Sequence, residues 1–376
     1  MSSALTGLLR HPIVQAPMAG GVSVPRLAAA VSEAGGLGFL AGGYKTADGM
    51  YREIKQMRGL TSRPFGVNLF MPQPEQSGAG AGSTTAAGAA PFDAGAVEVY
   101  AHQLAGEAAW YRTELGDPDS GRDDGYDAKL AVLLDDPVAA VSFHFGVPSP
   151  EVLASLRRAG TFTLVTATTV EEALAVERAG ADAVIVQGIE AGGHQGTHRD
   201  VPDNDGSGIG LLSLIALVRE AVGLPLVAAG GIMRGSQIAA ALAAGASAVQ
   251  LGTAFVPTPE SGAAAAHKEA LTDPLFVGTR LTRAFTGRPA RGLVNRFLRE
   301  HGRYAPAAYP EVHHLTAPLR KAAAAAGDAQ GMALWAGQGH RMARDMPAGE
   351  LVEVLAAEAG AVWAASAADA EGGAGR

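Results

Sequence analysis

The sequence predicts an α/β fold, a (β/α)8 TIM barrel with a helical lid near the C-terminus. Short apolar runs alternate with helical segments, the connections are short, and the apolar runs number eight. Eight strands that each precede a helix are typical of a closed barrel. An open doubly wound sheet is the alternative, and the even count favours the barrel. The predicted strands are 13–18, 37–41, 65–70, 139–143, 161–167, 183–186, 225–229 and 248–251.

Residues typical of helix termini flank the expected helices. Ser149 followed by Pro150 is a common start, because the Ser side chain caps free N–H groups and Pro fits the first turn. Glycines such as Gly35 and Gly180 are typical of helix ends. We expect helices at 24–34, 46–58, 95–115, 149–159, 169–180, 211–222, 236–244 and 263–271.

Three parts are expected along the chain. Residues 1–275 form the barrel, residues 276–345 a helical lid or substrate subdomain, and residues 346–376 a C-terminal helix that packs on the barrel and ends in a frayed tail. The alternation stops after Met71. Residues 76–90 consist of Gly, Ala, Ser and Thr after a single Gln, and we expect a low-complexity insertion there.

Composition excludes several classes of function. A net charge of -8 without a long basic run gives little support for nucleic-acid binding. The absence of cysteine excludes disulfides, thiol nucleophiles and iron–sulfur ligation, so redox chemistry would need a bound cofactor. We find no signal-peptide pattern and no apolar stretch long enough for a bilayer, and expect a cytoplasmic protein without a membrane partner.

Polar and glycine-rich residues follow the predicted strands, at the end where barrels place their reactive groups. Segment 187–196 surrounds His194 with three glycines, which leave open space around the imidazole. A histidine here can act as a general base near neutral pH, and a solvated loop histidine is the alternative. His144 ends the fourth strand, where it either points into the barrel mouth or packs as a rim histidine.

The turns after the seventh and eighth strands suggest a phosphorylated ligand. Gly230 and Gly231 follow one strand, and Gly252 and Thr253 follow the other. Barrels commonly bind phosphate at these two loops, where backbone N–H groups approach the anion closely. Tight turns in a glycine-rich protein are the alternative.

We predict no metal site. His198, His313 and His314 lack neighbouring ligands at suitable spacing, and we expect them at the surface. The acidic segment 200–206 does not match the ligand spacing of an EF-hand, so a solvated loop is expected.

Seven segments, in this order, resemble the nitronate monooxygenases, formerly called 2-nitropropane dioxygenases, in particular the bacterial class I branch. The likeness runs from about residue 10 to residue 345 and omits the segment 76–90. Each segment alone is a modest match, and the ordered set is specific. The segments are 12–21, 142–146, 187–196, 228–233, 248–255, 283–291 and 334–338.

The resemblance implies a barrel with a lid and non-covalently bound FMN. It implies that His194 is the catalytic histidine and that His144 is a second active-site histidine. The residues implied to contact the flavin are Met18, Asn68, Gln187, Gly192 and Gly193, and those implied to bind its phosphate are Gly231, Gln250, Leu251, Gly252 and Thr253.

The reaction implied is the oxidation of an alkyl nitronate, such as propionate-3-nitronate, by O2 to a carbonyl compound and nitrite. An FMN-dependent NAD(P)H:quinone or enoyl-thioester reductase is the alternative within the superfamily, and a flavin-free phosphate-binding isomerase or lyase is the alternative outside it. The expected partners are a nitronate or nitroalkane and O2, and we expect a monomer or homodimer. Tyr304, Tyr309 and Trp335 either shape an apolar pocket or serve in ordinary packing.

Overall fold

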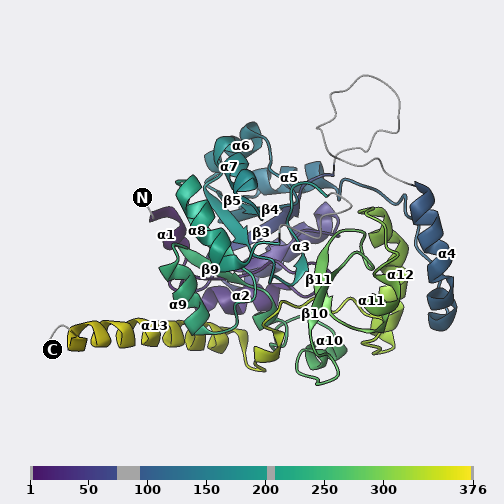
Figure 1. Cartoon of the computed structure of the whole chain (residues 1–376). Coiled ribbons are helices and arrows are strands. Elements are labelled where there is room, and N and C mark those ends of the chain that lie inside the picture. Colours follow the sequence, from purple (N-terminus) through teal and green to yellow (C-terminus); the bar gives the residue numbers. More distant parts are fainter. Residues whose placement is uncertain (1–2, 74–93, 201–207, 374–376) are drawn as a thin grey trace.

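An eight-stranded parallel sheet forms the centre of the computed structural model, which describes residues 3–73, 94–200 and 208–373 (Figure 1). The strand order is β1-β9-β8-β6-β5-β4-β3-β2, and a parallel bridge between Val14 and Leu37 joins β1 to β2. The sheet therefore closes into a barrel, which confirms the predicted fold and excludes the open sheet. The strands are β1 Ile13–Gln15, β2 Gly38–Ala41, β3 Phe65–Phe70, β4 Ala140–His144, β5 Phe162–Ala167, β6 Ala183–Gln187, β8 Leu226–Ala229 and β9 Ala248–Leu251.

Helices pack around the barrel, as alternating apolar strands and amphipathic helices require. The inside of the barrel is filled by side chains such as Phe39, Leu164 and Ile185, and Leu5 of α1 (Ser3–Leu8) joins this cluster. The helix α1 thus closes one end of the barrel. The helices that surround the sheet are α2 Pro25–Glu33, α3 Ala47–Leu60, α5 Tyr126–Asp135, α6 Pro150–Arg158, α7 Val170–Ala179, α8 Leu211–Ala221 and α9 Gly235–Ala243.

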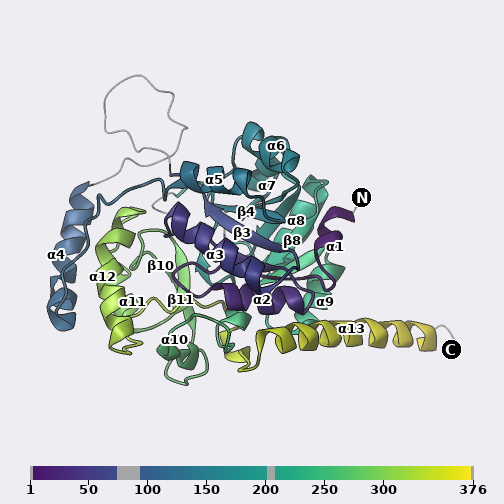
Figure 2. The same cartoon turned by 180° about the vertical axis from the view of Figure 1, so that it is seen from behind.

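The helix that follows β3 in the barrel is one that the sequence analysis did not predict. Tyr126, Leu130 and Leu133 of α5 face the main core, so α5 occupies the barrel position. The predicted helix at 95–115, which is α4 (Ala94–Tyr111), packs on α12 instead (Figures 1 and 2). The insertion expected at 76–90, just before α4, lies outside the described residues.

The region after the barrel contains a small sheet as well as the expected helices. It includes α10 (Ala265–Ala270), α11 (Arg296–His301) and α12 (Glu311–Ala325). Three antiparallel strands join it to the barrel mouth: β10 (Thr279–Thr282), β11 (Ala290–Leu293) and β7 (Gly193–His194). Because β7 is the loop that carries His194, this sheet attaches the predicted catalytic residue to the segment after the barrel.

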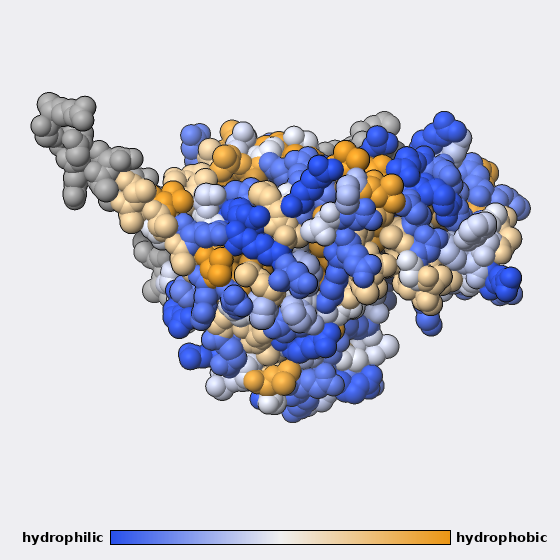
Figure 3. Space-filling model, turned by 90° about the horizontal axis from the view of Figure 1, so that it is seen from below, coloured by the Kyte–Doolittle hydropathy of each residue, from blue (hydrophilic) through white to orange (hydrophobic). Residues whose placement is uncertain are grey.

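The C-terminal helix α13 (Ala348–Gly373) lies along α9 and α2, and its far end projects beyond the barrel (Figures 1 and 2). Leu351, Val352 and Leu355 are buried in the main core, and the Glu358 carboxylate accepts a 2.8 Å hydrogen bond from Gly235 N. The surface in Figure 3 is mostly hydrophilic, with hydrophobic residues in small separate groups. In the described part of the chain, no helix is long and apolar enough to cross a membrane.

Replacing Leu355 with Ala tests the packing of α13. The Leu355 side chain is fully buried, so we expect the free energy of unfolding to fall by about 3 kcal/mol. The matched control is Glu353→Ala on the exposed face of the same helix, for which a change within about 0.5 kcal/mol is expected. Urea unfolding followed by circular dichroism measures both, and equal effects would contradict this packing.

Candidate active site

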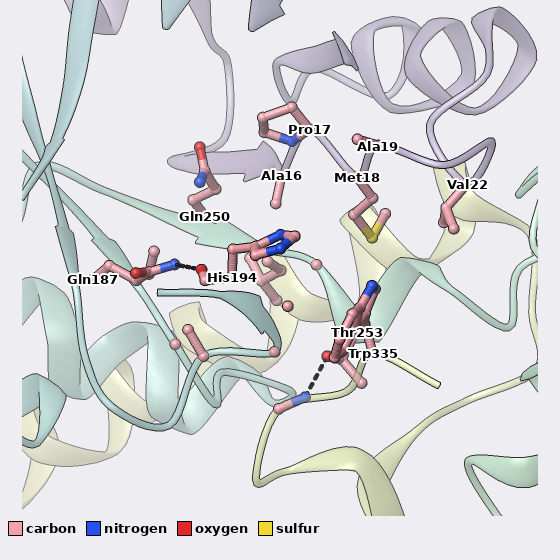
Figure 4. Close-up of a pocket in the computed structure, with 18 of the residues that line it drawn as sticks. Ala16, Pro17, Met18, Ala19, Val22, Gln187, His194, Gln250, Thr253 and Trp335 are labelled. Atoms are coloured by element: carbon pink, nitrogen blue, oxygen red, sulfur yellow. Dashed lines mark hydrogen bonds between the residues drawn. The ribbon is translucent and has the colours of Figure 1, made fainter. Parts of the chain in front are cut away.

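One pocket opens at the carboxyl ends of the barrel strands, where β1, β3, β4, β6, β8 and β9 end and β7 folds across them (Figure 4). Every residue predicted for the site lines this pocket, although their roles remain predictions. The segment after the barrel supplies part of the wall through Trp335, Gly337 and Gly339. The predicted residues brought together are Met18, Asn68, His144, Gln187, Gly192, Gly193, His194, Gly231, Gln250, Leu251, Gly252 and Thr253.

The side chain of Gln187 holds the loop that carries His194. Its Nε2 donates to the His194 carbonyl at 3.1 Å, and its Oε1 accepts from Gly196 N at 2.7 Å (Figure 4). The strand β7 also pairs with β11, where His194 lies opposite Ala290. The backbone of His194 is therefore bound from both sides.

A hydroxyl group orients the imidazole of His194. Its Nε2 lies 2.9 Å from Thr286 Oγ1, which lies 3.3 Å from the carbonyl oxygen of Arg288. If the Thr286 hydroxyl donates to that carbonyl, it accepts from a protonated Nε2. This arrangement leaves the lone pair of Nδ1 free to accept a proton.

His144 lies beside His194 at the end of β4. Its Nδ1 is 3.2 Å from Thr166 Oγ1. A Cβ added at Gly196 would lie 2.6 Å from His144 Cε1 and 2.6 Å from Thr166 Cγ2, so the His194 loop needs glycine at this position. The sequence left two positions for His144, in the barrel mouth or packed at its rim. The structure places its side chain in the lining of the pocket at the barrel mouth.

Burial keeps both imidazoles neutral. It lowers the pKa of His144 from 6.5 to about 3, and the nearby positive charge of Arg288 adds to this effect. Burial also lowers the pKa of His194 well below 6.5, with further lowering by His144 and Arg288. A neutral imidazole can accept a proton or a hydrogen bond, but with such a lowered pKa it is a weak base.

The pocket has features that fit a phosphorylated planar ligand. Gly231, after β8, has φ +69, and Gly193 in the His194 loop has φ +74 with no atom within 4 Å of an added Cβ. Both backbone conformations favour glycine. The open space at Gly193 leaves room for a ligand, whereas a Cβ added at Gly231 would lie 3.0 Å from Glu190 Cβ. Gln250 Oε1 is buried without a hydrogen-bond partner among the described residues, so it can accept from a ligand N–H. The open backbone at Gly193 and the free acceptor at Gln250, at a barrel position where phosphate commonly binds, therefore suit a phosphorylated cofactor that carries an N–H group.

The aromatic residues considered for the pocket lie in different environments. The rings of Tyr309 and Trp335 lie 5.9 and 5.7 Å from the His194 ring, and Trp335 lines the pocket. Tyr304 is 45% exposed, so it does not shape the pocket. The expected surface position of His313 is wrong, because its ring is buried and stacks on Tyr44 at 3.9 Å.

Three further residues lie near the imidazoles, and the sequence alone does not indicate a role for them. Thr286 binds His194, Phe145 packs between the histidines and Arg288, and Tyr44 lines the pocket. Thr286 and Arg288 lie within the segment 283–291 that carried the resemblance, but nothing in their spacing relates them to His194. Only the pairing of β11 with β7 brings them there.

Comparisons with known proteins agree on one family. A family model described as nitronate monooxygenase matches residues 2–358. The nitronate monooxygenase of Pseudomonas aeruginosa is 45% identical over 95% of this chain and 99% of its own length, and that of Paraburkholderia phytofirmans is 43% identical over 92% of each.

Solved structures of similar proteins share the fold of this chain. A nitroalkane oxidase from Streptomyces ansochromogenes is 77% identical, with a TM-score of 0.91 over 96% of this chain and 99% of that chain. FabK from Thermotoga maritima is 27% identical, with a TM-score of 0.72 over 97% and 98% of the two chains.

The lowered pKa of His144 predicts a pH-dependent stability. Between pH 6.5 and about 3 the unfolded chain binds a proton at this residue and the folded chain does not, so stability falls as the pH falls. We expect His144→Gln to reduce this slope by up to about 1.4 kcal/mol per pH unit, since one proton is involved.

Urea unfolding at a series of pH values measures that slope. The control is His102→Gln, whose side chain is exposed on α4 and outside the pocket. A slope unchanged by His144→Gln would show that His144 takes up its proton as readily in the folded chain as in the unfolded one.

Proposed function

This chain belongs to the nitronate monooxygenase family, and we propose that it oxidises alkyl nitronates with O2, using FMN, to a carbonyl compound and nitrite. The observation that carries the proposal is the His194 imidazole, which borders the same pocket as the glycine-rich turns after β8 and β9. Ordinary side chains supply no one-electron chemistry, and the chain has no cysteine. FMN, when bound, accepts electrons from the nitronate and allows reaction with O2.

The FMN would be held by backbone and amide groups. Gly231 and the turn 250–253 would bind the phosphate, because glycine lets N–H groups approach an anion closely. Asn68 Nδ2 already donates to Ser142 O at 3.1 Å, which leaves the Asn68 carbonyl oxygen for the ligand. The residues proposed beside the flavin ring are Met18, Asn68, Gln187, Gly192 and Gly193.

His194 would handle the proton of the substrate. With Nε2–H donated to Thr286, the free Nδ1 can remove the α-proton of a neutral nitroalkane or lie against a bound nitronate. The strongly lowered pKa of His194 makes proton removal slow. A nitronate formed in advance has no such proton to lose, so the site is better suited to the anion than to the neutral acid.

Reduction under anaerobic conditions tests the proposal. We expect propionate-3-nitronate to bleach the flavin absorbance of the purified protein and NADPH alone to leave it unchanged. The measurement is a spectrophotometric titration with each reductant. Fast bleaching by NADPH alone would contradict the nitronate assignment and favour a nicotinamide-dependent reductase.

Replacing His194 with Asn separates proton removal from oxidation. We expect kcat/KM for neutral nitroethane to fall by about 100-fold or more, within the usual range for loss of a general base. The value for pre-formed ethylnitronate should fall much less, because no proton is removed. Nitrite release measures both rates, and His102→Asn, on the exposed face of α4, is the control. Equal losses for the two substrates would exclude His194 as the base.

A further inference from the structure

Arg288 is a fully buried cation close to the pocket. Its side chain is 0% exposed, and it follows the loop that binds His194 through Thr286. One terminal nitrogen donates to Gln73 Oε1 at 2.6 Å, another donates to the carbonyl of Thr197, and Nε has no partner among the described residues. Its hydrogen-bonding partners are therefore uncharged.

The charge of Arg288 is not cancelled by a direct ion pair. Within the described ranges, no carboxylate lies at ion-pairing distance from it. Asp200, the carboxylate with the largest effect on Arg288, is bound by both terminal nitrogens of Arg283 at 2.7 Å. Burying a cation without a counterion is unfavourable, and such charges are often kept where they act on a bound ligand.

A single aromatic ring separates this cation from the two imidazoles. The guanidinium carbon lies 4.1 Å from the Phe145 ring centroid, and that ring lies 4.5 Å from His144 and 5.5 Å from His194. Phe145 has φ 72, an uncommon conformation for a non-glycine residue that the packing around it must hold. The field of Arg288 thus reaches the pocket through protein of low dielectric constant, where it is weakly screened.

We propose that Arg288 is a specificity-determining residue, whose buried charge makes the pocket favour an anionic nitronate over the neutral nitroalkane. The inference rests on the proposed function and adds the group that selects the ionised substrate. Arg288 attracts an anion beside His194, and it opposes the positive charge that His194 would gain by removing a proton from the neutral acid. Both effects favour the nitronate over the nitroalkane.

Other charged groups near the imidazoles reinforce this effect. His194 faces Arg288 and Arg320, and both cations disfavour a positive charge on its ring, whereas the neighbouring His144 ring is itself neutral. Arg288 and His198 likewise disfavour a positive charge on His144. Burial raises the pKa of Tyr309 well above 10, so its hydroxyl stays neutral and does not offset these cations.

Two variants remove the effect of the charge in different ways. Arg288→Met removes the cation and keeps the length of the side chain. Gln73→Glu keeps the guanidinium and places a carboxylate at the position of the present 2.6 Å contact, which supplies the missing counterion with almost no change in shape. Arg288→Lys, which retains the charge, is the matched control.

Steady-state kinetics with ethylnitronate and nitroethane give the first readout, because these substrates differ only in the α-proton and the charge. We expect Arg288→Met and Gln73→Glu each to lower kcat/KM for ethylnitronate about ten-fold and to raise that for nitroethane, because His194 then gains a proton more easily. The apparent pKa of the histidine limb of the pH profile should rise in both variants, and Arg288→Lys should retain most of the selectivity.

Binding of inorganic nitrate, a planar anion shaped like the nitro group, gives a readout independent of turnover. We expect its Kd, measured by calorimetry on the flavin-loaded protein, to rise about ten-fold in both charge-cancelling variants. Equal losses for the two substrates, with an unmoved pH profile and nitrate Kd, would overturn the inference and assign Arg288 a structural role.

Two outcomes separate this inference from the proposed function. If Arg288→Met does not fold, Gln73→Glu alone provides the test. Unchanged selectivity between ethylnitronate and nitroethane in Gln73→Glu then contradicts the inference. If the unmodified protein does not oxidise ethylnitronate, the proposed function fails, and the nitrate Kd of the variants still decides whether Arg288 favours an anion in the pocket.

Discussion

The two hydrogen bonds of the Gln187 amide hold the His194 loop across the mouth of the barrel. The amide ends β6, donates to the carbonyl of His194 and accepts from Gly196 N. Because the loop is held in this position, β7 can pair with β11, and the segment after the barrel covers one side of the pocket. The position of the imidazole, the wall formed by Trp335 and the contact with Thr286 all depend on that attachment.

The positive charge near the site comes from the segment that follows the barrel. The barrel contributes neutral amides, glycines and the two histidines, whereas Arg288 and Arg320 come from the later part of the chain. Two neutral imidazoles close to these two cations form an environment that attracts anions and resists further positive charge. That character suits a substrate that arrives already ionised.

Much of the fold and of the pocket could be predicted because both follow local patterns. The apolar runs mark all eight strands, and residues at the ends of several runs, such as His144, Gln187 and Gly231, line the pocket. Helix α5 escaped prediction because it directly follows an acidic, turn-rich stretch. Thr286, Phe145 and Arg288 could not be assigned, because their roles depend on strand pairing and ring packing between distant segments. His313 was misplaced for the same reason, since its partner Tyr44 lies at the far end of the sequence.

We propose that the glycine-lined mouth of this barrel binds FMN beside His194. The most direct measurement is the absorption spectrum of the purified protein, together with chromatographic identification of any cofactor released by heating. We expect a yellow protein with flavin bands that releases FMN at about one molecule per chain. A colourless protein that does not take up added FMN would contradict it and favour a flavin-free phosphate-binding barrel.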